Sequence, residues 1–282
     1  MKWYPIALAS IVVAWSSEAL AYPTAVVFAP TAESKDLGGI GGFAYGAAPV
    51  SPAPSSFTVA PWFALQAGIL PKAKLGSGYT FGGAELGLDA FGPGDGTYKP
   101  VLNGKLSLYK QAGWVPSVGV GFMQFAPGAL DKSLNLGYVA LTEAVTVGKN
   151  DFSIGTFTLG YAHSFAQRTA TGAEPIFHGT PPFSFGARGG LVLGYTSPSI
   201  GPVSFAVDHV GGYSEVSTTN LAVFVTPVSW AYIGAGYAFA NDRSATYRVD
   251  SAFAMVGFDV DIKTLLPQPT TAASRTAPSG GR

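Results

Sequence analysis

Segments of about ten residues in which apolar and polar side chains alternate fill residues 38–262, as in strands that cross a membrane. Polar breaks separate these segments, and short breaks alternate with long ones along the chain. The short breaks fall near 70–74, 110–113, 148–151, 197–201 and 226–229, and the long ones near 47–56, 91–100, 125–133, 165–182, 211–219 and 241–247. Tight turns belong on the periplasmic side of a membrane barrel and longer loops outside. These five short and six long breaks therefore predict twelve strands, with both chain ends in the periplasm.

The breaks also set the expected element boundaries. Strands are predicted near 38–46, 57–69, 75–90, 101–109, 114–124, 134–145, 152–164, 183–195, 203–210, 220–225, 230–240 and 248–262. Residues 22–37 contain two prolines and several charges, so we expect a periplasmic lead-in that can tuck into the barrel mouth. Residues 263–282 are rich in Pro, Thr, Ser and Ala and are predicted to be a disordered tail.

The first 21 residues have the organisation of a signal peptide. Lys2 lies near the start, an apolar stretch covers 5–15, and the stretch ends on Ala19-Leu20-Ala21, whose small residues suit signal peptidase. Cleavage is predicted before Tyr22. The alternative is a retained helical anchor, but the apolar stretch is shorter than the about 20 residues that a bilayer span needs.

Composition narrows the class of protein. The 282-residue chain has 37 Gly, 13% aromatic residues, only 11% charged residues and a mean hydropathy of +0.29. A soluble domain with so few charges is unusual. After the first 21 residues no run of about 18 apolar residues occurs, so helical spans are not predicted. Because lipid leaves exposed main-chain groups unsatisfied, a closed barrel is the remaining spanning structure. We therefore predict one all-β domain, a transmembrane antiparallel up-and-down β-barrel.

Charge and cysteine content exclude other classes. The chain has no Cys, which excludes disulfides and thiolate chemistry. The formal net charge is +0, so nothing indicates a nucleic-acid partner.

Alternation also assigns charged side chains to a face. In the third predicted strand Glu85 and Asp89 share one face, while Leu86 and Leu88 share the other. Because a charge facing lipid is costly, the two carboxylates are predicted to point into the lumen. Lys105 has lumen parity in the next strand, and antiparallel pairing across the intervening loop brings it near Glu85.

A second grouping of opposite charges is predicted across the turn at 197–201. Arg188 has lumen parity because Leu191 faces out, and Asp208 lies on the next strand; Glu143 is a candidate third contributor to the lumen charge. Two interpretations follow. The charges could form a constriction that selects solutes by sign and size, or ion pairs that satisfy one another in an occluded barrel. Twelve strands lie between the filled eight-stranded barrels and the open 16-stranded porins, so both interpretations stay open.

Catalytic and metal signals are weak. His163 precedes a serine and His209 follows an aspartate, but adjacent strand residues point to opposite faces, so neither dipeptide can form its own hydrogen-bonded pair. His178 lies in the longest loop without the further ligands that a metal site needs. We expect no catalytic residues, no metal and no cofactor.

The signal end Ala19-Leu20-Ala21, the strand at 183–195 and the aromatic-containing strand at 253–258 carry a resemblance to a known group of proteins. From 38 to 262 the chain resembles bacterial outer-membrane β-barrel proteins of the porin-like kind. One departure is that a tail follows Phe258, whereas such proteins commonly end on an aromatic residue that the barrel assembly machinery reads.

The resemblance implies a location in the outer membrane of a Gram-negative-type bacterium, in contact with membrane lipid, lipopolysaccharide and the barrel assembly machinery. It also implies passive transport or an envelope-structural role. We expect a narrow channel for small polar solutes. The alternatives are a non-conducting barrel that binds partners through its extracellular loops and, third, an outer-membrane hydrolase.

Overall fold

The computed structural model describes residues 27, 29–51, 60–75, 80–91, 99–110, 112–125, 135–148, 152–165, 189–211, 218–241 and 250–265. The predicted signal peptide, residues 1–21, lies outside the described residues, as does residue 22 with the predicted cleavage point. Of the predicted tail, only residues 263–265 are described, and they belong to a short helix, α1 (Ile262–Leu265). No helix in the described part of the chain is long and apolar enough to cross a membrane.

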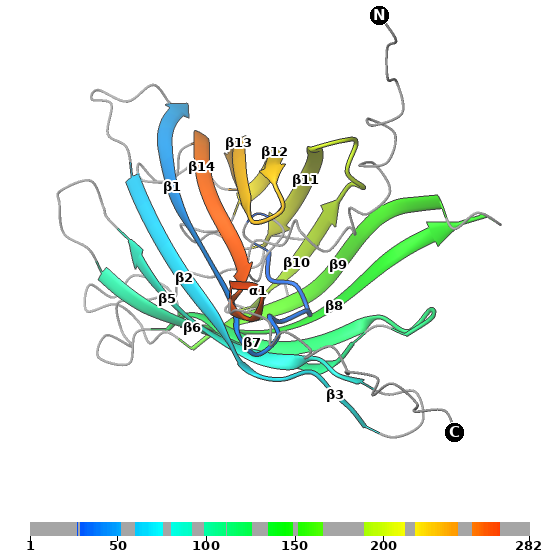
Figure 1. Ribbon diagram of the computed structural model, residues 1–282. Coiled ribbons are helices and arrows are strands. Elements are labelled where there is room, and N and C mark those ends of the chain that lie inside the picture. The colour runs from blue at the N-terminus through cyan, green and yellow to red at the C-terminus, as the bar shows by residue number, and fades with distance from the viewer. Residues whose placement is uncertain are drawn as a thin grey trace, which may run out of the picture.

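Twelve antiparallel strands form the wall of a closed barrel (Figure 1). In chain order the wall strands are β1 (Gly39–Ser51), β2 (Ala60–Leu70), β5 (Gly83–Phe91), β6 (Lys99–Tyr109), β7 (Ser117–Phe125), β8 (Leu136–Val147), β9 (Phe152–Ser164), β10 (Gly189–Thr196), β11 (Val203–Val210), β12 (Thr218–Val228), β13 (Ala231–Ala240) and β14 (Asp250–Asp261). Each strand pairs with the next, and β1 pairs with β14 to close the wall. The predicted up-and-down barrel of twelve strands is confirmed.

One predicted strand is divided in the structure. The segment predicted at 75–90 begins instead as a small hairpin of β3 (Ala73–Lys74) and β4 (Thr80–Phe81), which precedes β5. Gly83 adopts a φ of +92°, a conformation that L side chains rarely take, and this breaks the extended chain ahead of β5. The prediction of one long strand was wrong here because alternation does not report the backbone angle of a glycine.

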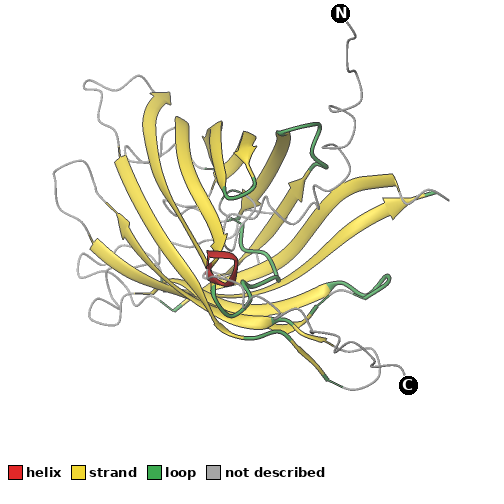
Figure 2. Ribbon diagram, in the orientation of Figure 1, coloured by secondary structure: helices red, strands yellow, loops and turns green. Residues whose placement is uncertain are grey.

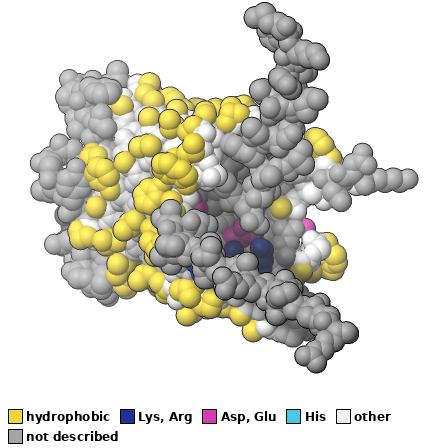
Figure 3. Space-filling model, viewed as in Figure 1, with side chains coloured by type: hydrophobic (Ala, Val, Ile, Leu, Met, Phe, Trp, Pro, Cys, Tyr) yellow, Lys and Arg dark blue, Asp and Glu magenta, His cyan; other side chains and the backbone are white. Residues whose placement is uncertain are grey.

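The two faces of the wall differ in chemistry. On the outer face Leu86 and Leu88 are 45% and 51% exposed, whereas Glu85, just before them in sequence, and Asp89, just after, are 2% and 3% exposed. The same alternation continues around the barrel, and hydrophobic side chains cover much of the outer wall in view (Figure 3). An apolar exterior around a polar interior is the arrangement of a barrel that crosses a lipid bilayer.

Large side chains fill one side of the interior. What we call the inner aromatic cluster consists of five aromatic residues, Phe43, Trp62, Phe224, Tyr232 and Phe253, together with Met255. All six side chains are at most 8% exposed. Glycines of the neighbouring strands make room for the rings. A Cβ on Gly257 would lie 2.2 Å from Cζ of Tyr232, and one on Gly236 would lie 2.4 Å from Cζ of Phe253. The cluster therefore depends on glycine at these wall positions.

Candidate functional site

A segment that precedes β1 lies inside the barrel (Figures 1 and 2). We call residue 27 together with residues 29–37 the inner segment. Val27, Ala29 and Ala32 are 0% exposed, although they belong to no strand of the wall. The predicted lead-in at 22–37 is thus described from residue 27 onwards, with a gap at 28, and this part lies in the lumen.

Asp208 of β11 holds the start of the inner segment. Its Oδ2 accepts hydrogen bonds from the main-chain N–H groups of Val27 and Ala29, both at 2.8 Å. Its Oδ1 accepts a hydrogen bond of 2.7 Å from the side-chain amide of Asn220 on β12. Asp208 is 1% exposed, so three N–H donors replace the water that its carboxylate has lost.

The middle of the inner segment contacts β7 and β8. The N–H of Ala32 donates a 2.8 Å hydrogen bond to Oγ1 of Thr142, which also lies 3.0 Å from Oγ1 of Thr158. A Cβ at Gly119 would lie 2.7 Å from the carbonyl oxygen of Ala32. Glycine at this wall position therefore allows the segment to approach β7.

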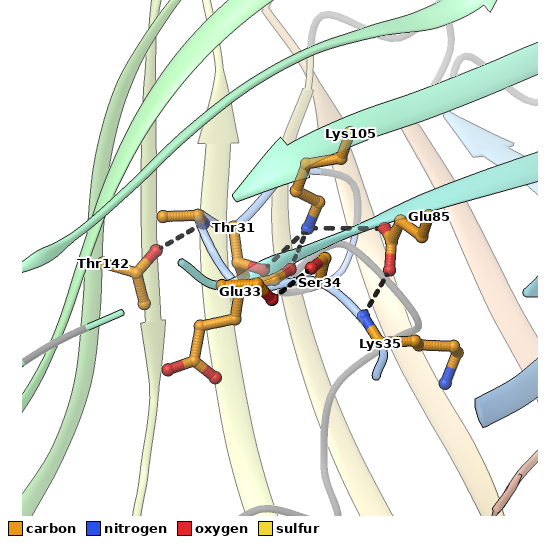
Figure 4. Close-up of polar contacts among 9 residues, drawn as sticks. Thr31, Glu33, Ser34, Lys35, Glu85, Lys105 and Thr142 are labelled. Atoms are coloured by element: carbon orange, nitrogen blue, oxygen red, sulfur yellow. Dashed lines mark hydrogen bonds and ion pairs between the residues drawn. The ribbon is translucent and has the colours of Figure 1, made fainter. Parts of the chain in front are cut away.

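A charged network joins the inner segment to β5 and β6 (Figure 4). Nζ of Lys105 lies 3.5 Å from Oε1 of Glu85, and it donates hydrogen bonds to Oγ1 of Thr31, at 3.3 Å, and to the carbonyl oxygen of Glu33. The second carboxylate oxygen of Glu85 accepts a 2.9 Å hydrogen bond from the N–H of Lys35. Lys105 and Glu85 are almost fully buried, so their pairing and these further contacts offset the loss of water around both charges.

Lys35 extends the network to the last strand of the barrel. Its Nζ lies 2.6 Å from Oδ1 of Asp259 on β14. A Cβ at Gly41 of β1 would lie 2.7 Å from the same nitrogen, so the lysine side chain passes closely over a glycine. Gly41 is the register partner of Asp259, which means that Lys35 reaches across the β1–β14 junction.

Asp36 fixes the inner segment at the barrel mouth. Its Oδ1 accepts hydrogen bonds from the N–H groups of Lys72, at 3.0 Å, and Leu37, at 2.8 Å. The hydrogen bond from Lys72, supported by the one from Leu37 and by the charge of Lys263, holds the pKa of the Asp36 carboxyl below its usual value against a partial loss of solvent. A Cβ at Gly68 would lie 1.9 Å from the carbonyl oxygen of Asp36, so the chain enters the lumen over a glycine.

The residues predicted from sequence to line the lumen have different positions in the structure. Glu85 and Lys105 are register partners and, like Asp208, contact the inner segment. Asp89 also lies on the lumen face, but it is outside the charged network and borders a cavity instead. Arg188 lies outside the described residues, so its predicted pairing with Asp208 remains a prediction.

Glu143 does not point into the lumen. Its neighbour Thr142 does, because Thr142 binds the inner segment, and Glu143 shares the opposite face with Leu141, which is 38% exposed. The expectation that Glu143 contributes to the lumen charge was therefore wrong. Glu143 lies four positions from the end of β8 at Val147, and a charge near the membrane interface costs at most about 1 kcal/mol.

A cavity of about 40 Å³ lies between the inner segment and the wall, and we call it the lumen cavity. Val27 and Pro30 of the inner segment form one side of it. The opposite side is formed by β1, β2 and β5 to β8, and the side chains that line it include Phe43, Trp62, Gln66, Glu85, Asp89 and Tyr138. The cavity thus combines aromatic rings with one carboxylate that the charged network does not use.

The histidines in the described residues have neutral partners. Nδ1 of His209 lies 2.9 Å from Oγ1 of Thr219, and Nδ1 of His163 lies 3.3 Å from the Tyr161 hydroxyl. Asp208, next to His209 in sequence, faces the lumen and binds the inner segment. Among the residues that the structure describes, no group of three metal-ligating side chains of the types His, Cys, Asp and Glu comes together. His178 lies outside them.

Sequence reasoning missed several residues that position the inner segment. Thr142 and Asn220 both have lumen parity, and this was the available signal. Strand parity could not identify the groups that these side chains and the other lumen residues bind in the inner segment. Most of those donors are main-chain N–H groups, which carry no signal in the sequence.

No protein-family model and no curated protein sequence matches this chain. Among solved structures, the chain is similar to the low-pH structure of OprB from Pseudomonas putida. The sequence identity is 11% and the TM-score is 0.30, and the alignment covers 79% of this chain and 91% of the other.

Proposed function

We propose that this protein is an outer-membrane channel for small polar solutes, and that its inner segment closes the lumen and opens it by moving. The observation that supports this most is how the segment is held. A few separate hydrogen bonds retain it, accepted by Asp208, Thr142 and Glu85 or donated by Lys105, whereas the wall strands are held by continuous ladders.

The energies of these two kinds of attachment differ. One hydrogen bond contributes about 0.5–1.5 kcal/mol net, or about 1.5–3 kcal/mol when one group is charged, so the segment is retained by several kcal/mol in total. Closure of the wall does not require the segment, since β1 pairs directly with β14 over most of its length. The segment can therefore leave its place while the barrel stays closed.

Departure of the inner segment would leave a polar path along the wall. Glu85, Lys105 and Asp208 would then face water, and charged side chains in a narrow passage select solutes by sign and by size. The inner aromatic cluster would remain in place and keep the passage narrow.

A second candidate function is a non-conducting barrel that binds partners through its extracellular loops. The observation that favours it is that aromatic side chains and the inner segment together occupy much of the lumen. The arrangement of the described histidines gives no comparable support to an outer-membrane hydrolase. Under either function we propose contact with membrane lipid and lipopolysaccharide, and insertion by the barrel assembly machinery.

Single-channel recording in planar bilayers tests the proposal. The chain that carries both Asp208→Ala and Thr142→Val loses the acceptors for three N–H groups of the inner segment. We expect it to spend more time open than the unaltered protein, because the inner segment is held by fewer hydrogen bonds while the strand pairing of the wall stays in place. Glu143→Gln, on the outer face, is the matched control and should leave the open fraction unchanged.

Absence of conductance in all three proteins, with folding verified by heat-modifiable migration on gels, would favour the non-conducting barrel. A screen with phospholipid and peptide substrates addresses the hydrolase separately, because hydrolysis does not require an open lumen.

A further inference from the structure

We infer that the lumen cavity beside Asp89 is a binding site for a small organic cation of the alkylammonium class. The inference rests on the proposed function, since it names a class of solute for the same lumen. The cavity lies between the inner segment and the wall, and two carboxylates of β5 line it: Glu85, which pairs with Lys105, and Asp89, which lies outside the charged network.

Asp89 differs from the other lumen carboxylates in what surrounds it. Glu85 is paired with Lys105, and Asp208 accepts three hydrogen bonds from N–H donors. The side chains that hydrogen-bond the Asp89 carboxylate, Asn103 and Trp62, are both neutral.

The Asp89 carboxylate is also incompletely satisfied. It is 3% exposed, and its Oδ1 has no hydrogen-bond partner among the residues that the structure describes. Within the same residues no basic side chain lies within ion-pair distance of it. Buried carboxylates in proteins are normally paired with a positive charge or fully hydrogen-bonded, so this site is suited to a ligand that supplies the charge.

The remaining lining selects the kind of cation. Phe43 and Trp62 pack edge to face with their centroids 5.1 Å apart, and Tyr138 adds a third ring to the cavity. Aromatic faces attract ammonium groups, and they also accept the attached methyl or methylene groups. A hard metal ion such as calcium needs six or more oxygen ligands, which a cavity so rich in rings does not provide.

The size of the cavity sets an upper limit on the ligand. A volume of about 40 Å³ is a few times the about 10–15 Å³ that one water requires. Methylammonium is small enough to lie in this space with its N–H groups toward Asp89, whereas tetramethylammonium is larger and has no N–H to donate. A sugar ring is also too large.

The inner segment completes the site. Val27 and Pro30 line the cavity, and Val27 is held in place by Asp208. A cation bound at Asp89 therefore contacts the segment that closes the lumen, and release of the segment removes one side of the site.

Isothermal titration calorimetry of the folded full-length mature protein in detergent, at constant ionic strength, tests the inference. Methylammonium chloride is the ligand, and tetramethylammonium chloride and sodium chloride are the comparators. We expect saturable binding of methylammonium alone. Asp89→Asn keeps the shape of the side chain and removes its charge, and it should weaken binding at least about tenfold, the factor expected for a hydrogen bond between charged groups.

Two further variants make the result specific. Tyr138→Leu removes a ring from the cavity and should also weaken binding, and it serves as the second test if Asp89→Asn does not fold. Glu143→Gln removes a carboxylate from the outer face and should leave binding unchanged. Equal affinity in the unaltered protein and in Asp89→Asn, or no saturable binding in the unaltered protein, would overturn the inference.

Bilayer recordings on the same preparation separate this result from the proposed function. Conductance without methylammonium binding would overturn the cation site and leave the channel intact. Methylammonium binding without conductance in any variant would retain the site and overturn the channel.

Discussion

The two sides of the lumen are filled in different ways. Along β12 to β14 the wall fills the space with its own side chains, such as Phe224, Tyr232 and Phe253, which interlock with glycines of neighbouring strands. Along β5 to β8, and at Asp208 of β11, the space is filled by the inner segment through hydrogen bonds and one buried ion pair. The aromatic side chains cannot leave the lumen without unfolding the wall that carries them. The inner segment can leave as a unit, so we expect any water path to open along β5 to β8 and Asp208.

Truncation of a ring on the aromatic side should have the largest effect. Phe253→Ala should lower the free energy of unfolding by about 3–5 kcal/mol, because it leaves a cavity among tightly packed side chains. Urea titration in detergent measures this change. Phe258→Ala on the exposed face of the same strand is the control and should cost much less. Similar losses from both variants would show that the aromatic cluster is not a packed core.

Removal of an anchor on the polar side should have a smaller and local effect. Asp208→Ala should reduce the hydrogen-exchange protection of the Val27 and Ala29 N–H groups by about 1.5–3 kcal/mol, the contribution of hydrogen bonds to a charged acceptor. The N–H groups of β13 should keep their protection. Exchange followed by mass spectrometry or NMR distinguishes the two groups. Loss of protection throughout the barrel would mean that the segment and the wall unfold together.

Substitution of the buried lysine tests charge selection on the polar side. Lys105→Ala leaves the Glu85 and Asp89 carboxylates with less positive charge nearby, so the open state should become more permeable to cations. The reverse shift is expected for Glu85→Ala combined with Asp89→Ala. Reversal potentials in a salt gradient measure both, and the shifts should shrink at high salt, where screening extends over only about 3 Å at 1 M. Unchanged selectivity in both variants would contradict a charged constriction.

The smallest expected effect concerns pH at the barrel mouth. Because the pKa of Asp36 is lowered in the folded protein, its carboxylate stabilises the inner segment above the unfolded pKa of about 3.9. That contribution is lost as the pH falls through the lower folded pKa. Acidification below about pH 4 should therefore raise the open fraction slightly, and Asp36→Asn should remove this part of the response. An identical acid response in Asp36→Asn would assign it to other groups.

Strand alternation was sufficient to predict the wall. It predicted the number of strands, the outward side of Leu86 and Leu88, and the inward side of Glu85, and hairpin pairing placed Lys105 near Glu85, which is its register partner in the structure. These features depend on neighbours in sequence or on adjacent strands. Alternation failed at Gly83, where a backbone angle interrupts the strand, and at Glu143, where proximity to the interface makes an outward charge inexpensive.

The inner segment could not be predicted in the same way. Its contacts with Asp208, Thr142 and Asp259 join parts of the chain that are distant in sequence. The segment has no periodicity of its own, and most of its donors are main-chain groups. Lys35 and its neighbours indicated only a charged lead-in, and the choice between a lumen position and a periplasmic one required the three-dimensional structure.

The contact between Lys35 and Asp259 has a consequence for the order of assembly. Lys35 lies four positions before the start of the first strand and Asp259 lies on the last, so the ion pair spans the junction at which the sheet closes into a cylinder. Asp259 comes within reach of Lys35 only when β14 pairs with β1. The Lys35–Asp259 ion pair therefore forms only after the barrel has closed. An assembly intermediate in which β1 and β14 are still apart cannot hold its inner segment through this contact.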